Sequence, residues 1–332
     1  MYTDFYGLSD RPFQLTPDAR FYYESRTHKK AMAYLGYGLA QGEGFIVITG
    51  EIGAGKTTLV AHLMATIDRA RLNAINIVST QVEGDDMLRL AAQGMGLVSG
   101  GVAKAQLLEQ VEQHLEDEAR RGKRTLLIVD EAQNLSISAL EELRMLSNFQ
   151  VGGQALLQIF LLGQPEFRDK LASESLEQVR QRVIATHHLE AMEPNEVEPY
   201  IVHRLKAVGW VGNPVIEIPA FAEIYRATGG VPRKINQFAG RLLLHAAVEG
   251  LDTIDAETVV AVAEDMQDDT PRAPAEPPAR ATFEPIRDLA FERRLAVLEA
   301  QLDEQERAMH RVLTLLVDWV EGEDDAVIHH AA

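Results

Sequence analysis

The octapeptide GEIGAGKT at residues 50–57 decides the fold class of this 332-residue chain. It matches the pattern G-x-x-x-x-G-K-[ST] at every fixed position. Residues 45–49 before it form an apolar run typical of a buried strand, and residues 58–64 after it are typical of the start of a helix. A strand, a glycine turn and a helix N-terminus together form a phosphate cradle, because backbone N–H groups and the helix dipole both favour negative charge.

This cradle predicts a site for a nucleoside triphosphate. The ammonium of Lys56 can reach the terminal phosphates, and the hydroxyl of Thr57 can bind Mg²⁺. A chance match in a glycine-rich turn is the alternative, and the flanking strand and helix argue against it. We expect ATP and its Mg²⁺ to be held by Gly50, Glu51, Ile52, Gly53, Ala54, Gly55, Lys56, Thr57 and Thr58.

A second motif follows at residues 126–131, where the apolar run LLIV ends in Asp130 and Glu131. Such a run suits a central parallel strand, and ligands of open α/β sheets lie at the carboxyl ends of the strands. We therefore expect Asp130 to hold Mg²⁺ through water and Glu131 to orient and activate the attacking water. Two acids at the start of a helix are the alternative, and the phosphate loop upstream favours the catalytic interpretation.

Composition limits the other possibilities. A chain of this length can hold two domains and a tail, and its 46% hydrophobic and 25% charged residues are ordinary for a globular protein. It has no cysteine, which excludes disulfides, thiolate catalysis and cysteine-rich zinc sites. The first residues lack a secretory pattern, and no apolar run approaches the roughly 20 residues that span a bilayer. We expect a cytoplasmic protein without direct membrane insertion, peripheral to the inner membrane only through partners.

The formal net charge of −18 opposes non-specific binding to nucleic acid. One basic patch, RRGKR at residues 120–124, could override that average locally, but cations that complement a helix C-terminus are the favoured alternative. Adjacent His187 and His188 cannot easily share a metal ion, because neighbouring residues of a strand point to opposite faces. We expect no metal other than the Mg²⁺ that accompanies ATP.

Residues 1–190 alternate strands and helices, the pattern of a parallel sheet with helices on both faces. This region should form the nucleotide-binding α/β domain of a P-loop NTPase. The expected strands are 45–49, 74–78, 126–131, 156–162 and 183–189, and the expected helices after the one that follows the phosphate loop are 85–93, 104–120, 137–148 and 176–181.

Residues 191–266 show no strong strand signal and should form a small all-helical lid domain. Helices are expected at 194–208, 219–227, 232–250 and 255–266. Pro194, Pro219 and Pro232 suit first-turn positions, and Gly209 and Gly250 suit stops after two of the helices. Residues 267–284 are rich in proline and polar residues, so we expect an extended or disordered linker there.

Residues 285–320 carry a seven-residue hydrophobic repeat of about four heptads, which predicts a coiled-coil helix. Gln305 occupies one seam position, where a polar residue can set register or strand number. An amphipathic helix that folds back onto its own domain is the alternative, and the preceding linker favours association with a second copy or a partner. The apolar seam positions are Phe291, Leu295, Leu298, Leu302, Met309, Val312, Leu316 and Trp319.

The order and spacing of several short motifs resemble the AAA+ ATPases. Among these the chain looks most like the general secretion pathway protein A type, and more closely the ATPases found beside exosortase (PEP-CTERM) and exopolysaccharide loci. Each motif is weak alone, but together they make a specific set over about residues 1–266. They are YGL at 6–8, PFQLTPD at 12–18, GEGF at 42–45, the phosphate loop, VDEAQNL at 129–135, LRMLSNF at 143–149, LGQPE at 162–166, RQRV at 180–183 and GGVPR at 229–233.

The resemblance implies roles for four polar residues beyond these motifs' phosphate-binding core. Gln164 would sense the γ-phosphate or the attacking water, with a turn glutamine as the alternative. Arg182, or Arg180, would reach the γ-phosphate of a neighbouring subunit, with surface arginines as the alternative. Arg233 would reach the phosphates from the lid and report its closure.

The resemblance also implies that the N-terminal segment covers the nucleotide. Phe13 and Phe21 would pack on adenine, with hydrophobic packing under a loop as the alternative. Gln81, after the second strand, would hold Glu131 inactive until a partner binds.

Together these features predict an α/β protein: a P-loop NTPase sheet of the AAA+ type, then a small all-helical lid, then a C-terminal coiled-coil helix. Mg-dependent ATP hydrolysis would drive conformational or assembly work in a secretion or exopolysaccharide export system. The chain would form a homo-oligomer through its AAA+ interface and its coiled coil. Two alternatives stay open: a DNA-binding AAA+ ATPase of the transposition target-selection kind, against which the acidic charge argues, and a nucleotide-gated scaffold.

Overall fold

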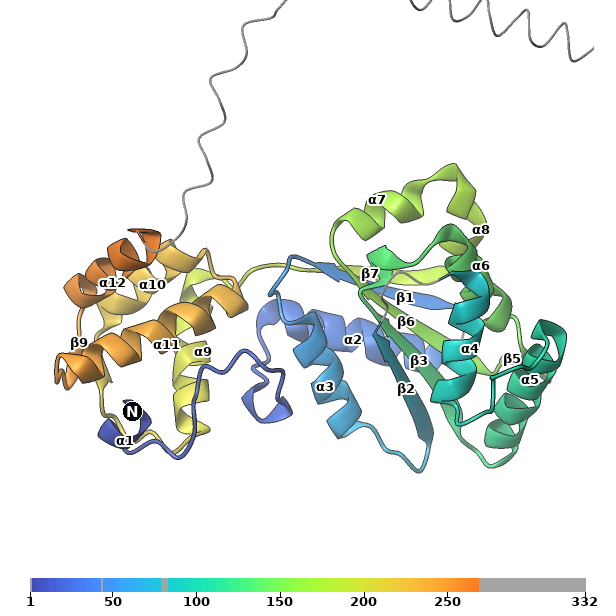
Figure 1. Ribbon diagram of the computed structural model, residues 1–332, viewed down its shortest axis with the longest axis horizontal. Helices are drawn as coiled ribbons and strands as arrows, with labels where there is room; N and C mark the ends of the chain where they lie inside the picture. Colours follow the sequence, from blue (N-terminus) through green and yellow to red (C-terminus); the bar gives the residue numbers. More distant parts are fainter. Residues whose placement is uncertain (1, 43, 79–82, 269–332) are drawn as a thin grey trace, which may run out of the picture. The chain divides into compact units, whose positions relative to one another are not determined.

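The computed structural model describes residues 2–42, 44–78 and 83–268, and its central element is a five-stranded parallel sheet (Figure 1). The strand order is β2-β3-β6-β1-β7, so that β1, which precedes the phosphate loop, lies between β6 and β7. Each strand matches its predicted range to within two residues at either end. The strands are β1 (Phe45–Gly50), β2 (Leu72–Val78), β3 (Arg124–Asp130), β6 (Leu157–Gly163) and β7 (Val183–Leu189).

Helices cover both faces of this sheet, as the apolar strands predict. Ile46 and Ile48 of β1 pack with α2 (Arg26–Gln41) and α3 (Lys56–Thr66). The alternate residues Phe45 and Val47 pack with the helices of the other face. Every residue of β1 and β6 is buried, which explains why the strands are continuous apolar runs rather than alternating ones. The helices of the second face are α4 (Gly84–Gly94), α5 (Lys104–Arg120), α6 (Ile137–Leu146), α7 (Glu166–Ala172) and α8 (Glu177–Arg180).

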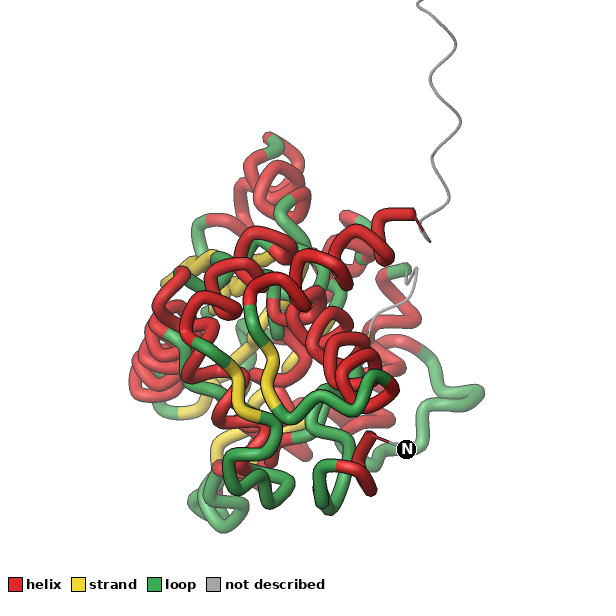
Figure 2. Tube along the Cα trace, turned by 90° about the vertical axis from the view of Figure 1, so that its left-hand side faces the viewer, coloured by secondary structure: helices red, strands yellow, loops and turns green. Residues whose placement is uncertain are grey.

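The tube view, which faces the left-hand side of Figure 1, shows helices in front of and around the strands (Figure 2). Two of the smaller elements form a hairpin after α6, β4 (Gln150–Val151) and β5 (Gln154–Ala155), which was not predicted. The remaining short pieces are α1 (Tyr2–Phe5) and the 3-10 turns η1 (Ala19–Phe21), η2 (Ala132–Asn134) and η3 (Glu174–Leu176). The helix expected at 176–181 is present as the shorter α8, directly after η3.

Helix α2 was also not predicted, because Gly36 and Gly38 lower the helix propensity of its last turns. The structure gives a packing reason for one of these glycines. A Cβ on Gly38 would lie 2.5 Å from Cγ1 of Ile46, whereas a Cβ on Gly36 would meet nothing within 4 Å. The helix can approach β1 only because position 38 has no side chain.

The region after the sheet is mainly helical, with α9 (Pro194–Lys206), α10 (Ile218–Thr228), α11 (Pro232–Val248) and α12 (Ala256–Asp268). Prolines stand in the first turns of α9, α10 and α11, as predicted. The expectation of no strand is wrong in one detail, since β8 (Val215–Ile216) and β9 (Thr253–Ile254) form a two-residue parallel pair. Such short pairs leave no periodic signal in a sequence.

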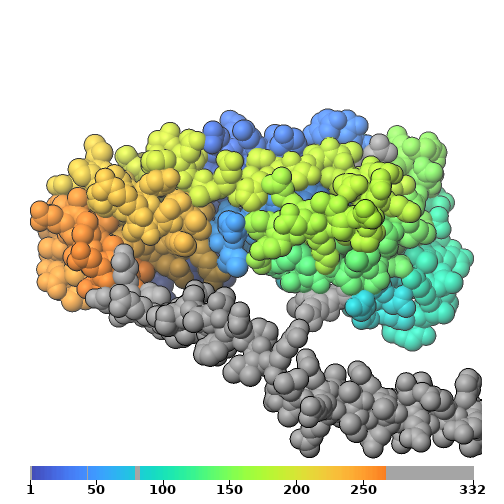
Figure 3. Space-filling model, turned by 90° about the horizontal axis from the view of Figure 1, so that it is seen from above, coloured from blue at the N-terminus to red at the C-terminus, as the bar shows by residue number. Residues whose placement is uncertain are grey.

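The hydrophobic core of this helical region includes side chains from the start of the chain: Tyr6, Leu8, Phe13 and Phe21. In the space-filling view, blue residues from the first part of the chain are visible between the yellow and orange helices and the green residues (Figure 3). The N-terminal segment thus packs with helices nearly 200 residues away in sequence. Helix α12 extends to Asp268, beyond the expected end of the lid. The rest of the predicted linker, the predicted coiled coil and Gln81 lie outside the described residues.

Candidate nucleotide site

The phosphate loop connects β1 to α3 and curls around the Lys56 side chain. Two of its glycines, Gly53 and Gly55, have positive φ angles of 86° and 95°. Lys56 is only 6% exposed, and its Nζ donates to the carbonyls of Gly50 at 2.6 Å and Glu51 at 3.1 Å. Burial lowers the pKa of Lys56, which nearby carboxylates oppose. The loop therefore holds a partly desolvated ammonium inside a ring of backbone groups.

Two elements from distant parts of the sequence press against this loop. A Cβ on Gly53 would lie 2.4 Å from Cβ of Arg233, the second residue of α11, and the Arg233 amide donates to the Gly53 carbonyl at 3.2 Å. A Cβ on Gly55 would lie 2.7 Å from Nε2 of His28 on α2. Only glycine fits at both positions, because the loop conformation and these neighbours both exclude a side chain.

The next two predicted residues meet at the carboxyl end of β3. The hydroxyl of Thr57 donates to Oδ2 of Asp130 at 2.9 Å. Asp130 is 3% exposed, and burial raises the pKa of this carboxyl while the hydrogen bond from Thr57 lowers it. A hydroxyl and a buried carboxylate are the hard oxygen ligands that Mg²⁺ prefers, with waters completing its shell. The donor set therefore fits the metal that accompanies ATP.

Glu131 follows in an unusual backbone conformation. It is the only non-glycine residue in the described part of the chain with a positive φ, 56°, a conformation that costs about 1–3 kcal/mol and is typical of functional sites. Oε2 of its carboxylate accepts a hydrogen bond from Nε2 of Gln133 at 2.6 Å and a longer one from Nε2 of Gln164 at 3.4 Å. Gln164, which follows β6, thus lies beside Glu131, and its predicted contact with the γ-phosphate or the attacking water stays a prediction.

Gln133 lies within the VDEAQNL motif, and the turn at Glu131 gives it a role that the motif alone does not reveal. Its amide donates to Glu131, and its Oε1 accepts from the backbone amide of Gln164 at 3.0 Å. One side chain therefore connects the ends of β3 and β6. The signal in the sequence was a glutamine two residues after Glu131, which gains meaning only once the left-handed turn is known.

A cavity of about 360 Å³ opens from the phosphate loop toward the N-terminal segment and α11. Phe21 lines this cavity, as do Lys56, Glu131, Gln164 and Arg233. Phe13 does not, although both phenylalanines belong to the core of the helical region. Both predicted aromatic residues therefore pack in the helical core, and one of them, Phe21, also lines the cavity.

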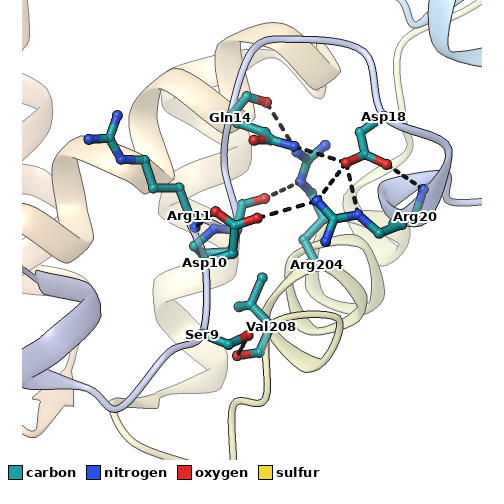
Figure 4. A network of polar contacts seen from close by, with 9 residues as sticks. Ser9, Asp10, Arg11, Gln14, Asp18, Arg20, Arg204 and Val208 are labelled. Atoms are coloured by element: carbon teal, nitrogen blue, oxygen red, sulfur yellow. Dashed lines mark hydrogen bonds and ion pairs between the residues drawn. The ribbon is translucent and has the colours of Figure 1, made fainter.

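A buried arginine fixes the N-terminal segment over this cavity. We call residues 9–21 the N-terminal strap. Arg204 of α9, 5% exposed, donates through Nε to the Pro12 carbonyl at 2.6 Å and through a terminal nitrogen to the Gln14 carbonyl at 3.1 Å (Figure 4). Its guanidinium also lies over the ring of Phe21, with 4.6 Å to the ring centroid. Arg204 thus connects the strap to α9, in addition to the packing of Phe13 and Phe21 in the helical core.

Surface contacts complete the strap. Asp18 accepts from the Arg20 amide at 2.8 Å and forms an ion pair with the Arg20 side chain at 2.7 Å, while Asp10 lies 3.3 Å from the same guanidinium (Figure 4). The hydroxyl of Ser9 and the carbonyl of Val208 are 3.0 Å apart and form a further bond to the helical region. Because Arg20 is exposed, these ion pairs contribute much less than the buried Arg204.

The two candidate trans-acting arginines come just before the amino end of β7, whereas the phosphate loop follows the carboxyl end of β1. The Arg182 carbonyl accepts from the amide of Phe45, at the amino end of β1, whereas the phosphate loop follows its carboxyl end. Arg182 and Arg144 line one groove of about 690 Å³. Arg180 instead donates to the Ala172 carbonyl at 3.0 Å and lies 3.9 Å from Glu177. Neither candidate lines the nucleotide cavity of its own chain.

The two histidines of β7 have separate hydrogen-bond partners. Nε2 of His187 is 3.0 Å from the Thr27 carbonyl, and Nδ1 of His188 is 3.0 Å from the Thr49 hydroxyl. In the described ranges, no cluster of three or more His, Cys, Asp or Glu could hold a metal ion. A larger groove of about 720 Å³ between α2 and β7, lined by Tyr34 and Tyr37, contains no part of the phosphate loop and is not the nucleotide site.

The parallel sheet, the phosphate loop and the acidic end of β3 define the class of protein: this chain is a P-loop ATPase with the AAA+ fold. Residues 39–171 match the family model described as AAA domain. Over 251 residues the chain is 36% identical to General secretion pathway protein A of Aeromonas hydrophila. The aligned region covers 75% of this chain and 46% of that protein. The chain therefore spans about half the length of this relative.

Solved structures support the fold. The Aeropyrum pernix ORC2 protein superposes with a TM-score of 0.56 over 77% of this chain and 72% of that one, at 16% identity. CDC6P from Pyrobaculum aerophilum superposes with a TM-score of 0.55 over 78% and 71%, at 17% identity. At such low identity the similarity concerns the fold alone. Over the residues that the structure describes, no helix is both long and apolar enough to cross a membrane.

Proposed function

We propose that this ATPase uses Mg-dependent ATP hydrolysis to drive conformational or assembly work in a secretion or exopolysaccharide export system. The 36% identity to General secretion pathway protein A supports the secretion context. The earlier resemblance to ATPases beside exosortase and exopolysaccharide loci supports the choice of export system. We further propose that the protein works in the cytoplasm as a homo-oligomer and meets the inner membrane through its partners.

One observation carries the catalytic part of the proposal: Thr57, Asp130 and Glu131 lie together at the carboxyl edge of the sheet beside Lys56. Bound Mg²⁺ would supply positive charge to the phosphate oxygens. Lys56, freed from its two carbonyls, would bind the terminal phosphates. Glu131 would accept a proton from the attacking water through the carboxylate oxygen that Gln133 and Gln164 leave free.

The turnover experiment compares three variants of the full chain. Lys56→Ala should lose nucleotide binding and hydrolysis together. Glu131→Gln should bind ATP normally but lose hydrolysis, because an amide cannot act as a base. Glu198→Gln, on an exposed position of α9, is the matched control and should behave as the wild type. Equal hydrolysis by Glu131→Gln and the wild type would contradict the assignment.

We propose Arg182 as the residue that completes a neighbouring site, because it lies at the opposite edge of the sheet from its own phosphate loop. ATPase activity per subunit should then rise with protein concentration. Arg182→Ala should bind ATP but hydrolyse it slowly, and mixing it with Glu131→Gln should restore part of the activity. Exposed Arg69→Ala is the control. Confirmed mixed assembly without any rescue would argue against a trans-acting Arg182.

The partner experiment uses Glu131→Gln loaded with ATP as bait, compared with the wild type loaded with ADP. Capture of components of an envelope export system in the ATP state alone is the expected result. Turnover that is stimulated by DNA and falls steeply with salt would instead support a DNA-binding ATPase.

A further inference from the structure

Asn236 is a nearly buried polar residue of the nucleotide cavity that no motif assigns. It lies on α11 three residues after Arg233 and is 8% exposed. It lines the same cavity as Lys56 and Phe21. A rise of about 1.5 Å per helical residue places it roughly 4.5 Å along the helix axis from the residue that touches Gly53. It therefore stands beyond the phosphate loop, toward the strap.

A chain of hydrogen bonds fixes which way the Asn236 amide faces. Arg204 donates to the Tyr200 hydroxyl at 3.2 Å, and a guanidinium can only donate. The Tyr200 hydroxyl in turn donates to Oδ1 of Asn236 at 2.8 Å. Burial raises the pKa of Tyr200, so its proton stays available for this bond. A reversed amide would leave the tyrosine proton without its acceptor.

Because these hydrogen bonds run from Arg204 through Tyr200 to Oδ1 of Asn236, the NH₂ group of Asn236 is the end that faces the cavity. Its Nδ2 makes no hydrogen bond to any other residue in the described ranges, whereas its Oδ1 accepts the bond from Tyr200. An amide donor that opens onto the cavity can give its hydrogen bond to a ligand there in place of water. The cavity beyond the phosphates is where the nucleoside of ATP must lie, and the ring nitrogens of adenine are acceptors.

We propose that Asn236 determines base specificity by donating from its side-chain amide to a ring nitrogen of adenine, N1, N3 or N7. Tyr200 and Arg204 act through it as positioning residues. Since Arg204 also attaches the strap, the same cation orders the aromatic wall of the cavity and the base-reading amide. This inference rests on the proposed nucleotide site, and it adds that Asn236 recognises the adenine base.

The experiment measures dissociation constants of ADP and of its 1-deaza, 3-deaza and 7-deaza analogues for the full chain. One analogue should bind about five- to fifty-fold more weakly than ADP, because the amide loses its acceptor. Asn236→Ala should weaken ADP by a similar factor and bind that analogue no worse than ADP. Asn236→Asp keeps the shape but presents an acceptor, so it should weaken ADP at least as much. Tyr200→Phe should weaken ADP by a smaller factor and reduce the difference between ADP and that analogue.

Several outcomes would overturn the proposal. If all three analogues bind the wild type as tightly as ADP, no ring nitrogen is read, and this result requires no folded variant. If Asn236→Ala weakens ADP and every analogue equally, the amide contacts another part of the nucleotide. Lys56→Ala distinguishes failure of the phosphate site from failure of the base contact. If that variant binds ADP like the wild type, the proposed phosphate site itself is wrong. If it loses ADP binding, but Asn236→Ala does not change the difference between ADP and its deaza analogues, only the inference about Asn236 is overturned.

Discussion

Replacing Arg204 by methionine should release the N-terminal strap from the helical region without unfolding the sheet. Methionine keeps much of the apolar stem but removes the donors to the carbonyls of Pro12 and Gln14. Bonds from an ionised donor contribute about 1.5–3 kcal/mol each, so two carbonyls left buried would cost about 3–6 kcal/mol. If the strap lifts and water reaches them, we expect about half of that, roughly 1.5–3 kcal/mol.

Hydrogen exchange of the full chain measures this directly. A change of about 1.4 kcal/mol is tenfold in an equilibrium constant, so opening of the strap should become about 10- to 140-fold more frequent. The amide of Ser9, which donates to the Val208 carbonyl at 2.9 Å, is a suitable probe. Amides of β1, β3 and β6 should exchange as in the wild type. ADP affinity should also fall, because Phe21 lines the cavity and stacks on the guanidinium.

Two controls make the result interpretable. Arg11→Met removes an exposed arginine of the same strap, whose side chain points away from the network (Figure 4). Arg204→Lys keeps the charge but cannot reproduce the planar set of donors, so it should fall between the wild type and the methionine variant. Strap amides that exchange at the wild-type rate in Arg204→Met would refute the reasoning. Faster exchange throughout the sheet would show that Arg204 supports the whole fold instead.

Three further predictions concern His28, Gln133 and a pair of glycines. Burial lowers the pKa of His28 to about 4 from 6.5, so the unfolded chain takes up a proton that the folded chain refuses as pH falls between these values. In urea unfolding, the free energy of unfolding of the wild type should fall by about 3 kcal/mol more than that of His28→Gln between pH 6.5 and pH 4. An equal pH dependence of the two proteins would contradict this. Gln133→Leu removes the 2.6 Å bond to Glu131 and should slow single-turnover hydrolysis about tenfold or more. The affinity for ADP should stay unchanged. An unchanged rate of hydrolysis would argue against a positioning role of Gln133. Gly38→Ala should destabilise the protein by about 1–3 kcal/mol through the clash with Ile46, whereas Gly36→Ala should stabilise it by up to about 1 kcal/mol, and melting temperatures that move in the same direction would contradict the packing of α2.

The sheet was predictable because its physical cause is local. The central strands β1, β3 and β6 are buried on both faces and are therefore nearly continuous apolar runs, which can be recognised in the sequence. Helix α2 was not, because the glycine that lowers its propensity is required by contact with Ile46, a residue of another element. The β8–β9 pair was missed for a similar reason, since two residues on each side are stabilised by their surroundings and not by their own pattern.

The site divides in the same way. Lys56, Thr57, Asp130 and Glu131 were predicted because short motifs encode them, and the structure brings all four together at one edge of the sheet. Their roles stay predictions until the turnover variants are measured. His28, Arg204 and Asn236, by contrast, lie in no sequence motif that predicts their place at the site. Each gains its place from a partner that lies 27 to 192 residues away in sequence, a separation that no local pattern can reveal.

These long-range contacts have a consequence for how the nucleotide can act on the rest of the chain. Helix α11 touches the phosphate loop through the Arg233 amide and, one turn later, joins the buried chain of Asn236, Tyr200 and Arg204. That chain ends on the carbonyls of the strap. A buried network of this kind is costly to break at any single link, so α9, α11 and the strap should move as one body. A change at Gly53 when the terminal phosphate is lost would therefore be passed to the whole body through α11, and the strap would follow its helix and not the sheet.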